Sequence, residues 1–149
     1  MRFFLEKIEA LGVGWNRRPL SEADFYVLCR RHKITVQEMS LRVSGFYYSM
    51  LGRHFIAIDS RLPPAKKLFV MFHEFAHFLM HAPDNGVTAN FHGIGRKTRK
   101  ETEADLFAAI ALIPRCWLET RTAYEIVTEE GIDPELVDER FRIFKYRGI

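Results

Sequence analysis

The strongest constraint on this chain is the motif His-Glu-Phe-Ala-His at residues 73–77, which lies inside an apolar segment. Residues four apart on an α-helix lie on one face, about 6 Å apart along the axis, so the imidazoles of His73 and His77 can bind the same metal ion. Glu74 follows the first histidine directly, where its carboxylate can reach a water molecule on that ion without being a ligand. Zinc suits such a site, because it accepts imidazole and carboxylate ligands and can keep one position open for water.

Apolar residues flank the motif on both sides, from Leu68 to Phe72 and from Phe78 to Met80. The alternative interpretation is a surface helix with scattered polar residues, but a helix that is apolar nearly all round is buried. Polar groups in a buried helix need partners, and a metal ion is one. The segment therefore predicts a buried metal-binding helix over residues 63–81.

A catalytic zinc ion with an open position needs a third protein ligand. Residues 101–109 predict a helix, since they are rich in Ala, Leu and Glu. Glu101 and Asp105 share a face of that helix, so one carboxylate could bind the metal while the other accepts a hydrogen bond from a ligating histidine. Two alternatives stay open, in which Glu103 is the ligand or Glu101 only closes a capping box with Thr98.

The two segments 73–81 and 101–114 together resemble the ImmA/IrrE family of zinc metallopeptidases, which is similar to the gluzincins. Residues 45–48 and 56–59, before the motif, also resemble the family. The resemblance extends over about residues 20–148.

Carried over residue by residue, the resemblance implies that His73, His77 and Glu101 are the metal ligands. It implies that Glu74 is the general base and that Asp105 is the hydrogen-bond partner of a ligating histidine. The expected cofactor is one Zn²⁺ ion per chain, and the ligand types favour zinc over manganese or iron.

The function that the resemblance implies is a zinc-dependent endopeptidase, which hydrolyses peptide bonds with a metal-activated water. Members of the family often cleave a helix-turn-helix transcriptional repressor, so we expect a protein substrate of this kind as the partner. One alternative is a catalytically silent binding module, such as a regulatory or toxin–antitoxin partner. Glu74 argues against it, because a pure binder needs no base there. The other alternative is a DNA-contacting regulator.

Charge and composition exclude several other classes. The net charge is only +3, and the one dense basic run, residues 96–100, is typical of a solvated loop, so nucleic acid is not an expected partner. Glu6 and Lys7 interrupt the apolar start of the chain, which argues against a signal peptide, and no apolar run is long enough to span a membrane. Cys29 and Cys116 lack metal-site spacing and predict free thiols, so we expect a cytoplasmic protein.

The sequence is less informative about the rest of the active site. The mechanism needs a group that stabilises the transition state, and His92, Arg96 and Tyr124 are weak candidates. Residues 82–99 predict a long loop. The strand at residues 55–59 is a candidate edge strand, to which an extended substrate could pair.

With 149 residues, the chain predicts a single domain, residues 1–149, of the α+β class. Residues 45–50 and 54–59 alternate as strands do, and the Leu-Gly pair between them predicts a hairpin in a small antiparallel sheet. This sheet would pack beside a zincin-like core of four or five helices, which includes one helix over 117–130 and a last helix over 133–146.

Overall fold

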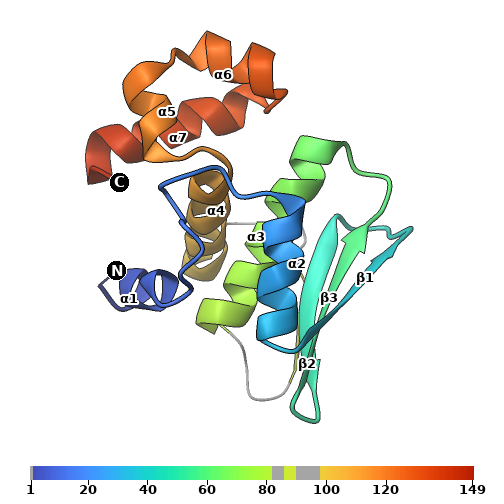
Figure 1. Ribbon diagram of the computed structural model, residues 1–149. Coiled ribbons are helices and arrows are strands. Elements are labelled where there is room, and N and C mark those ends of the chain that lie inside the picture. Colours follow the sequence, from blue (N-terminus) through green and yellow to red (C-terminus); the bar gives the residue numbers. More distant parts are fainter. Residues whose placement is uncertain (1, 82–85, 90–97) are drawn as a thin grey trace.

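The computed structural model describes residues 2–81, 86–89 and 98–149, and within them it places seven helices and four strands. The helices lie on one side of the sheet (Figure 1), so the α+β class is confirmed. The elements in chain order are α1 (Arg2–Glu9), α2 (Glu22–Arg31), β1 (Ile34–Met39), β2 (Gly45–Met50), β3 (Arg53–Asp59), α3 (Pro64–His81), β4 (Gly86–Ala89), α4 (Arg99–Leu112), α5 (Arg115–Thr120), α6 (Ala123–Glu130) and α7 (Pro134–Arg147).

The sheet has the strand order β1-β3-β2-β4. β2 and β3 form the predicted hairpin, in which Met50 pairs with Arg53, and both turn residues have positive φ, 51° at Leu51 and 74° at Gly52. Such φ values are typical of tight hairpin turns. β4 pairs antiparallel with β2, but β1 pairs parallel with β3. The sheet is therefore mixed, and the expectation of an all-antiparallel sheet is wrong.

β3 lies in the interior of the sheet, between β1 and β2. The expectation that residues 55–59 form an edge strand for substrate is therefore also wrong. Among the described strands, β1 and β4 form the edges. Consecutive strands usually pair with each other. Here β1 does not pair with β2, the next strand in the chain, but with β3, whose other edge is taken by β2.

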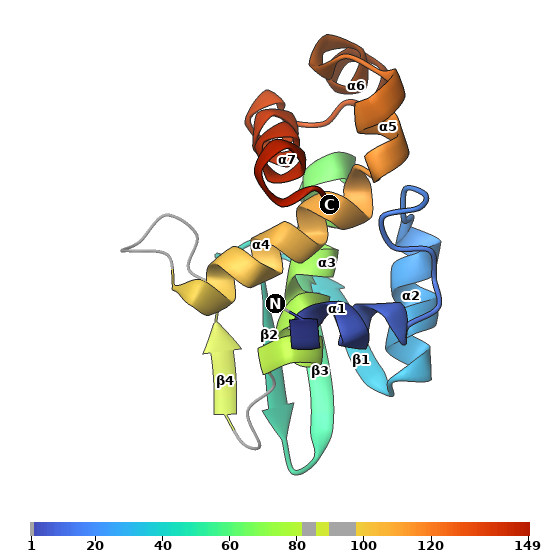
Figure 2. The ribbon, with the colours of Figure 1, turned by 90° about the vertical axis from the view of Figure 1, so that its left-hand side faces the viewer.

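Helix α3 is the central element, because it packs on β2 and β3 and also on α4 (Figure 2). Every residue from 70 to 76 is buried, which confirms the predicted buried helix. The approach of helix and sheet is close: a Cβ atom added at Gly45 would lie 2.8 Å from a side-chain carbon of Val70. Although α3 is apolar, neither it nor another helix of the described segments is long and apolar enough to cross a membrane.

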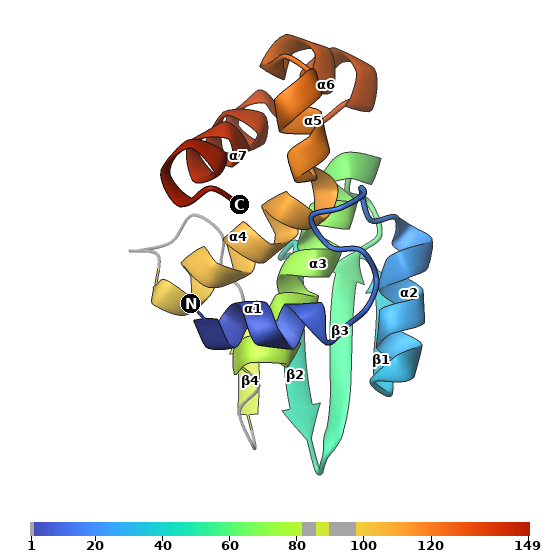
Figure 3. The same ribbon diagram turned by 60° about the vertical axis from the view of Figure 1, so that its left-hand side comes forward.

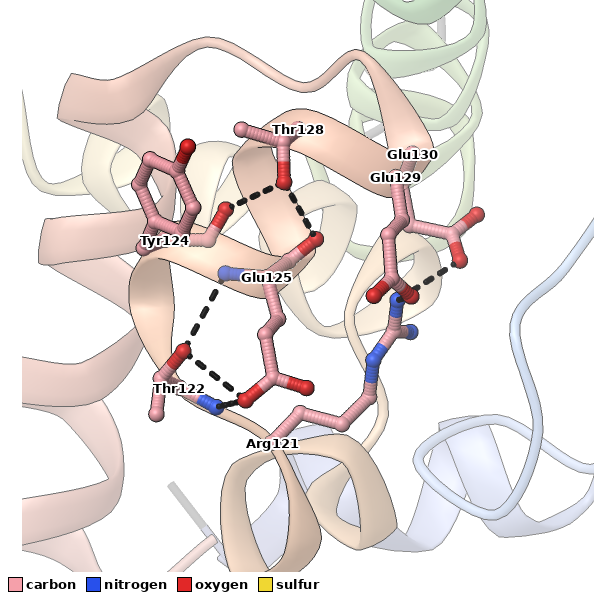
Figure 4. A network of polar contacts seen from close by, with 7 residues as sticks. All are labelled: Arg121, Thr122, Tyr124, Glu125, Thr128, Glu129 and Glu130. Carbon is pink, nitrogen blue, oxygen red and sulfur yellow. Dashed lines mark hydrogen bonds and ion pairs between the residues drawn. The ribbon is translucent and has the colours of Figure 1, made fainter.

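The helical part of the fold has more helices than the four or five expected. α1 forms where no helix was expected, and the single helix expected over 117–130 is divided into α5 and α6. The backbone is extended at Arg121 and Thr122. The Thr122 hydroxyl accepts a hydrogen bond from the backbone N–H of Glu125, whose carboxylate accepts one from Thr122 (Figure 4). This capping box begins a new helix at that point.

Arg140 of α7 is fully buried and joins three parts of the chain. Its guanidinium donates hydrogen bonds to the carbonyls of Ile113 and Ile149, both at 2.7 Å, and to the side-chain oxygen of Asn16 at 3.0 Å. Burial lowers the pKa of Arg140 to about 10, and the charge of Arg115 adds to this shift. The side chain is therefore still a cation at neutral pH, and it fixes α7 to the end of α4.

We expect Arg140→Ala to lower the free energy of unfolding by at least about 2 kcal/mol, because several buried acceptors lose their donor. Arg142→Ala on the same helix is the matched control, since Arg142 is exposed and pairs only with Glu139 among the described residues, at 3.1 Å. It should change the free energy by no more than about 0.5 kcal/mol. Urea denaturation measures both, and equal effects would contradict the anchoring role of Arg140.

Candidate metal centre

The two motif histidines lie where α3 contacts α4. His73 is fully buried and His77 nearly so, and their Nε2 atoms are 3.2 Å apart. The four-residue spacing thus brings both rings to one face of the helix, as the sequence predicts. The ring of Phe69, one turn earlier, lies 6.0 Å from the ring of His73. Phe69 was not among the predicted site residues, although the same four-residue spacing places it on the face of His73 and His77.

Glu101, in the first turn of α4, meets both histidines. Its Oε2 atom lies 3.2 Å from Nε2 of His73, and its Oε1 atom lies 2.9 Å from Nε2 of His77. The hydroxyl of Thr98 accepts a hydrogen bond from the backbone N–H of Glu101 at 3.2 Å. Thr98 therefore caps α4 without the Glu101 side chain, which is directed to the histidines instead.

The structure separates the two glutamates that compete as third ligand. The Glu103 carboxylate forms an ion pair with Arg99, with Nε and Oε1 2.9 Å apart. By contrast, one donor atom each from His73, His77 and Glu101 lie within 4.8 Å of one another. This group could hold a metal ion.

Asp105 lies on the other side of the His73 ring, with Oδ1 2.7 Å from Nδ1. When Nδ1 donates its proton to Asp105, Nε2 carries a lone pair. This lone pair then faces the Glu101 carboxylate and the second imidazole, so a cation between these atoms relieves their repulsion. Two imidazole nitrogens and a carboxylate oxygen are a donor set that suits zinc.

The electrostatics of the site favour positive charge. Burial lowers the pKa of the His73 imidazole, but hydrogen bonds to Asp105 and Glu101 and the charge of Glu74 outweigh burial and raise it to about 10. Burial raises the pKa of Glu101, but its hydrogen bonds to the two histidines outweigh this, and the pKa is lowered overall. The same negative surroundings that stabilise an imidazolium would stabilise a divalent cation.

Glu74 follows His73 on α3 and is fully buried. Its charge acts on His73, but it is not part of the group formed by His73, His77 and Glu101. Of the three candidates for transition-state stabilisation, His92 and Arg96 lie outside the described residues. Tyr124 is on α6 and is 77% exposed, so the structure does not bring it to the contact between α3 and α4.

Zinc content tests the ligand set. We expect about one zinc ion per chain by elemental analysis, and a loss of bound zinc in His77→Ala, because two protein ligands hold the ion poorly. Glu101→Ala should weaken zinc binding strongly. Glu103→Ala is the matched control on the same helix and should change it little. If Glu103→Ala lost as much zinc as Glu101→Ala, the third ligand would have to be reassigned.

The partner of His73 has a separate test. Asp105→Ala should lower zinc affinity or activity by roughly 10–100-fold, because the imidazole loses the group that orients it. Competition with a chelator measures this affinity. Asp105→Asn, which keeps a hydrogen-bond acceptor, should recover part of the loss. Parent-like affinity in Asp105→Ala would show that Asp105 does not orient the ligand.

Comparison with known proteins gives one result. The family model described as the IrrE N-terminal-like domain, a peptidase family, matches residues 29–143, which include all of α3 and α4. A search of curated proteins finds no match. The match covers well over half of the chain and confirms the resemblance found in the sequence. This chain therefore belongs to the peptidase family of the IrrE N-terminal-like domain.

Proposed function

We propose that this protein is a zinc-dependent endopeptidase, in which His73, His77 and Glu101 hold the ion. The observation that supports this function best is the convergence of these three donors from α3 and α4 in a chain of a peptidase family. When bound, zinc supplies a Lewis acid, which polarises a carbonyl group and lowers the pKa of water toward about 7.

The residues of the chain then have separate tasks. The Glu74 carboxylate accepts a proton from the attacking water and returns it to the leaving amine. Asp105 keeps the proton of His73 on Nδ1, so that Nε2 faces the cluster. The burial of both histidines and of Glu74 keeps bulk water away from these transfers.

For the substrate, we propose a protein, and specifically a helix-turn-helix transcriptional repressor, as the resemblance to the ImmA/IrrE family implies. We further propose that the protein works in the cytoplasm, where its free thiols, Cys29 and Cys116, stay reduced. The silent binding module and the DNA-contacting regulator remain alternatives, and one substitution separates them from the peptidase.

That substitution is Glu74→Gln, which keeps the size of the side chain and the three proposed ligands but removes the proton acceptor. Zinc content and folding should stay as in the parent, and cleavage of a candidate repressor should fall by about 10²–10⁴-fold or more. Cleavage is followed by mass spectrometry of the products. A Glu74→Gln protein that keeps its biological activity in full would contradict the peptidase and favour the binding module.

A further inference from the structure

A groove with a volume of about 1320 Å³ lies between the first turns of α3, one side of α4, the end of α6 and one side of α7. Figure 3 shows α7 next to α4, which in turn crosses α3. The groove comes close to the candidate metal centre, because Phe69 and Asp105, which both contact His73, are part of its lining. A chain bound there would therefore lie beside the contact between α3 and α4.

The inner surface of the groove is apolar. Phe69 comes from α3, Leu106 and Ala109 come from α4, and Leu136 and Ile143 come from α7. These side chains are buried or half-buried within the chain itself. An apolar surface of this kind can accept the apolar side chains of a bound peptide.

The wall that α6 and the first half of α7 contribute is acidic. Residues 122–139 contain seven carboxylates and no lysine or arginine, in a chain whose net charge is +3. Four of them, Glu130, Asp133, Glu135 and Glu139, line the groove. The whole lining has six carboxylates and four cationic side chains, so it is negative overall.

Several of these carboxylates are held in place by neighbours. Arg121 forms ion pairs with Glu129 and Glu130, at 2.6 and 3.0 Å, which fixes the end of α6 (Figure 4). Glu139 pairs with Arg142. Glu135 makes no ion pair with any residue in the described part of the chain, so its exposed charge is available to a partner.

The carboxylates of α6 and α7 also argue against nucleic acid as a partner of this surface. α6 and α7 are joined by a short turn through Gly131, an arrangement that resembles a helix-turn-helix. In that motif the second helix lies in the major groove of DNA. The first turns of α7, the second helix here, carry Glu135, Asp138 and Glu139. Carboxylates at these positions repel phosphates, so the wall suits a cationic protein segment and not DNA.

We propose that this groove binds a segment of the protein substrate in which lysine or arginine alternates with apolar residues. The basic side chains would face the acidic wall of α6 and α7, and the apolar ones would face the inner surface. This inference rests on the proposed peptidase function, and it adds a substrate-selecting site away from the scissile bond. Binding energy from such remote contacts positions the substrate for the reaction.

Fluorescence anisotropy tests the groove with the intact, zinc-loaded chain carrying Glu74→Gln, which should not cleave the probe. The probes are two fluorescein-labelled peptides of equal length with leucines at the same positions and either lysine or glutamate elsewhere. We expect the lysine peptide to bind more tightly than the glutamate peptide. Glu135→Lys should weaken its binding by roughly three- to tenfold, more so at low salt.

Asp138→Lys is the matched control, because it makes the same charge change on the same helix outside the groove lining. Glu139→Lys repeats the test if Glu135→Lys lowers the melting temperature. Three outcomes would overturn the proposal. They are an equal loss of lysine-peptide binding in the groove and control variants, equal binding of the lysine and glutamate peptides, and displacement of the peptide by duplex DNA. Zinc content and cleavage by the parent chain are measured separately, so a failure here is distinguishable from a failure of the peptidase function.

Discussion

The contact between α3 and α4 is the interaction on which the rest of the structure depends. α3 lies between the sheet and α4, and every residue from 70 to 76 is buried, including two side chains that are polar and ionisable, those of His73 and Glu74. Such groups are costly in a buried helix unless partners balance them. Glu101 and Asp105 of α4 approach His73 from two sides and supply the opposite charge. The same contact therefore compensates the buried polar groups and brings together the three donors of the candidate metal centre.

The sequence predicts those features of the fold that depend on residues close together in the chain, and it fails for features that depend on residues far apart. The buried helix over 63–81 and the shared face of Glu101 and Asp105 follow from residues within one or two turns, and the buried helix is confirmed. The parallel pairing of β1 and the interior position of β3 depend on contacts across the hairpin, which strand periodicity does not specify. The division between α5 and α6 was missed for a different reason, since the Thr122–Glu125 capping pair is visible in the sequence.

Helices α6 and α7 form the acidic wall of the groove in which we propose that the substrate is selected. Buried Arg140 fixes α7 to the end of α4, and Arg121 fixes the end of α6, so the acidic wall has a defined position relative to α4. A peptidase needs contacts beyond the scissile bond to choose among proteins, because every protein offers the same peptide group. The groove beside α7 passes close to the candidate metal centre, at Phe69 and Asp105, and can supply such contacts.

X-ray absorption spectroscopy of the zinc-loaded chain identifies the ligands of the ion, because it reports the atoms around it. We expect two imidazole nitrogens at about 2.0–2.1 Å and carboxylate oxygen at about 2.0–2.2 Å. Sulfur at about 2.3 Å, or a spectrum without imidazole, would contradict the His73, His77 and Glu101 site.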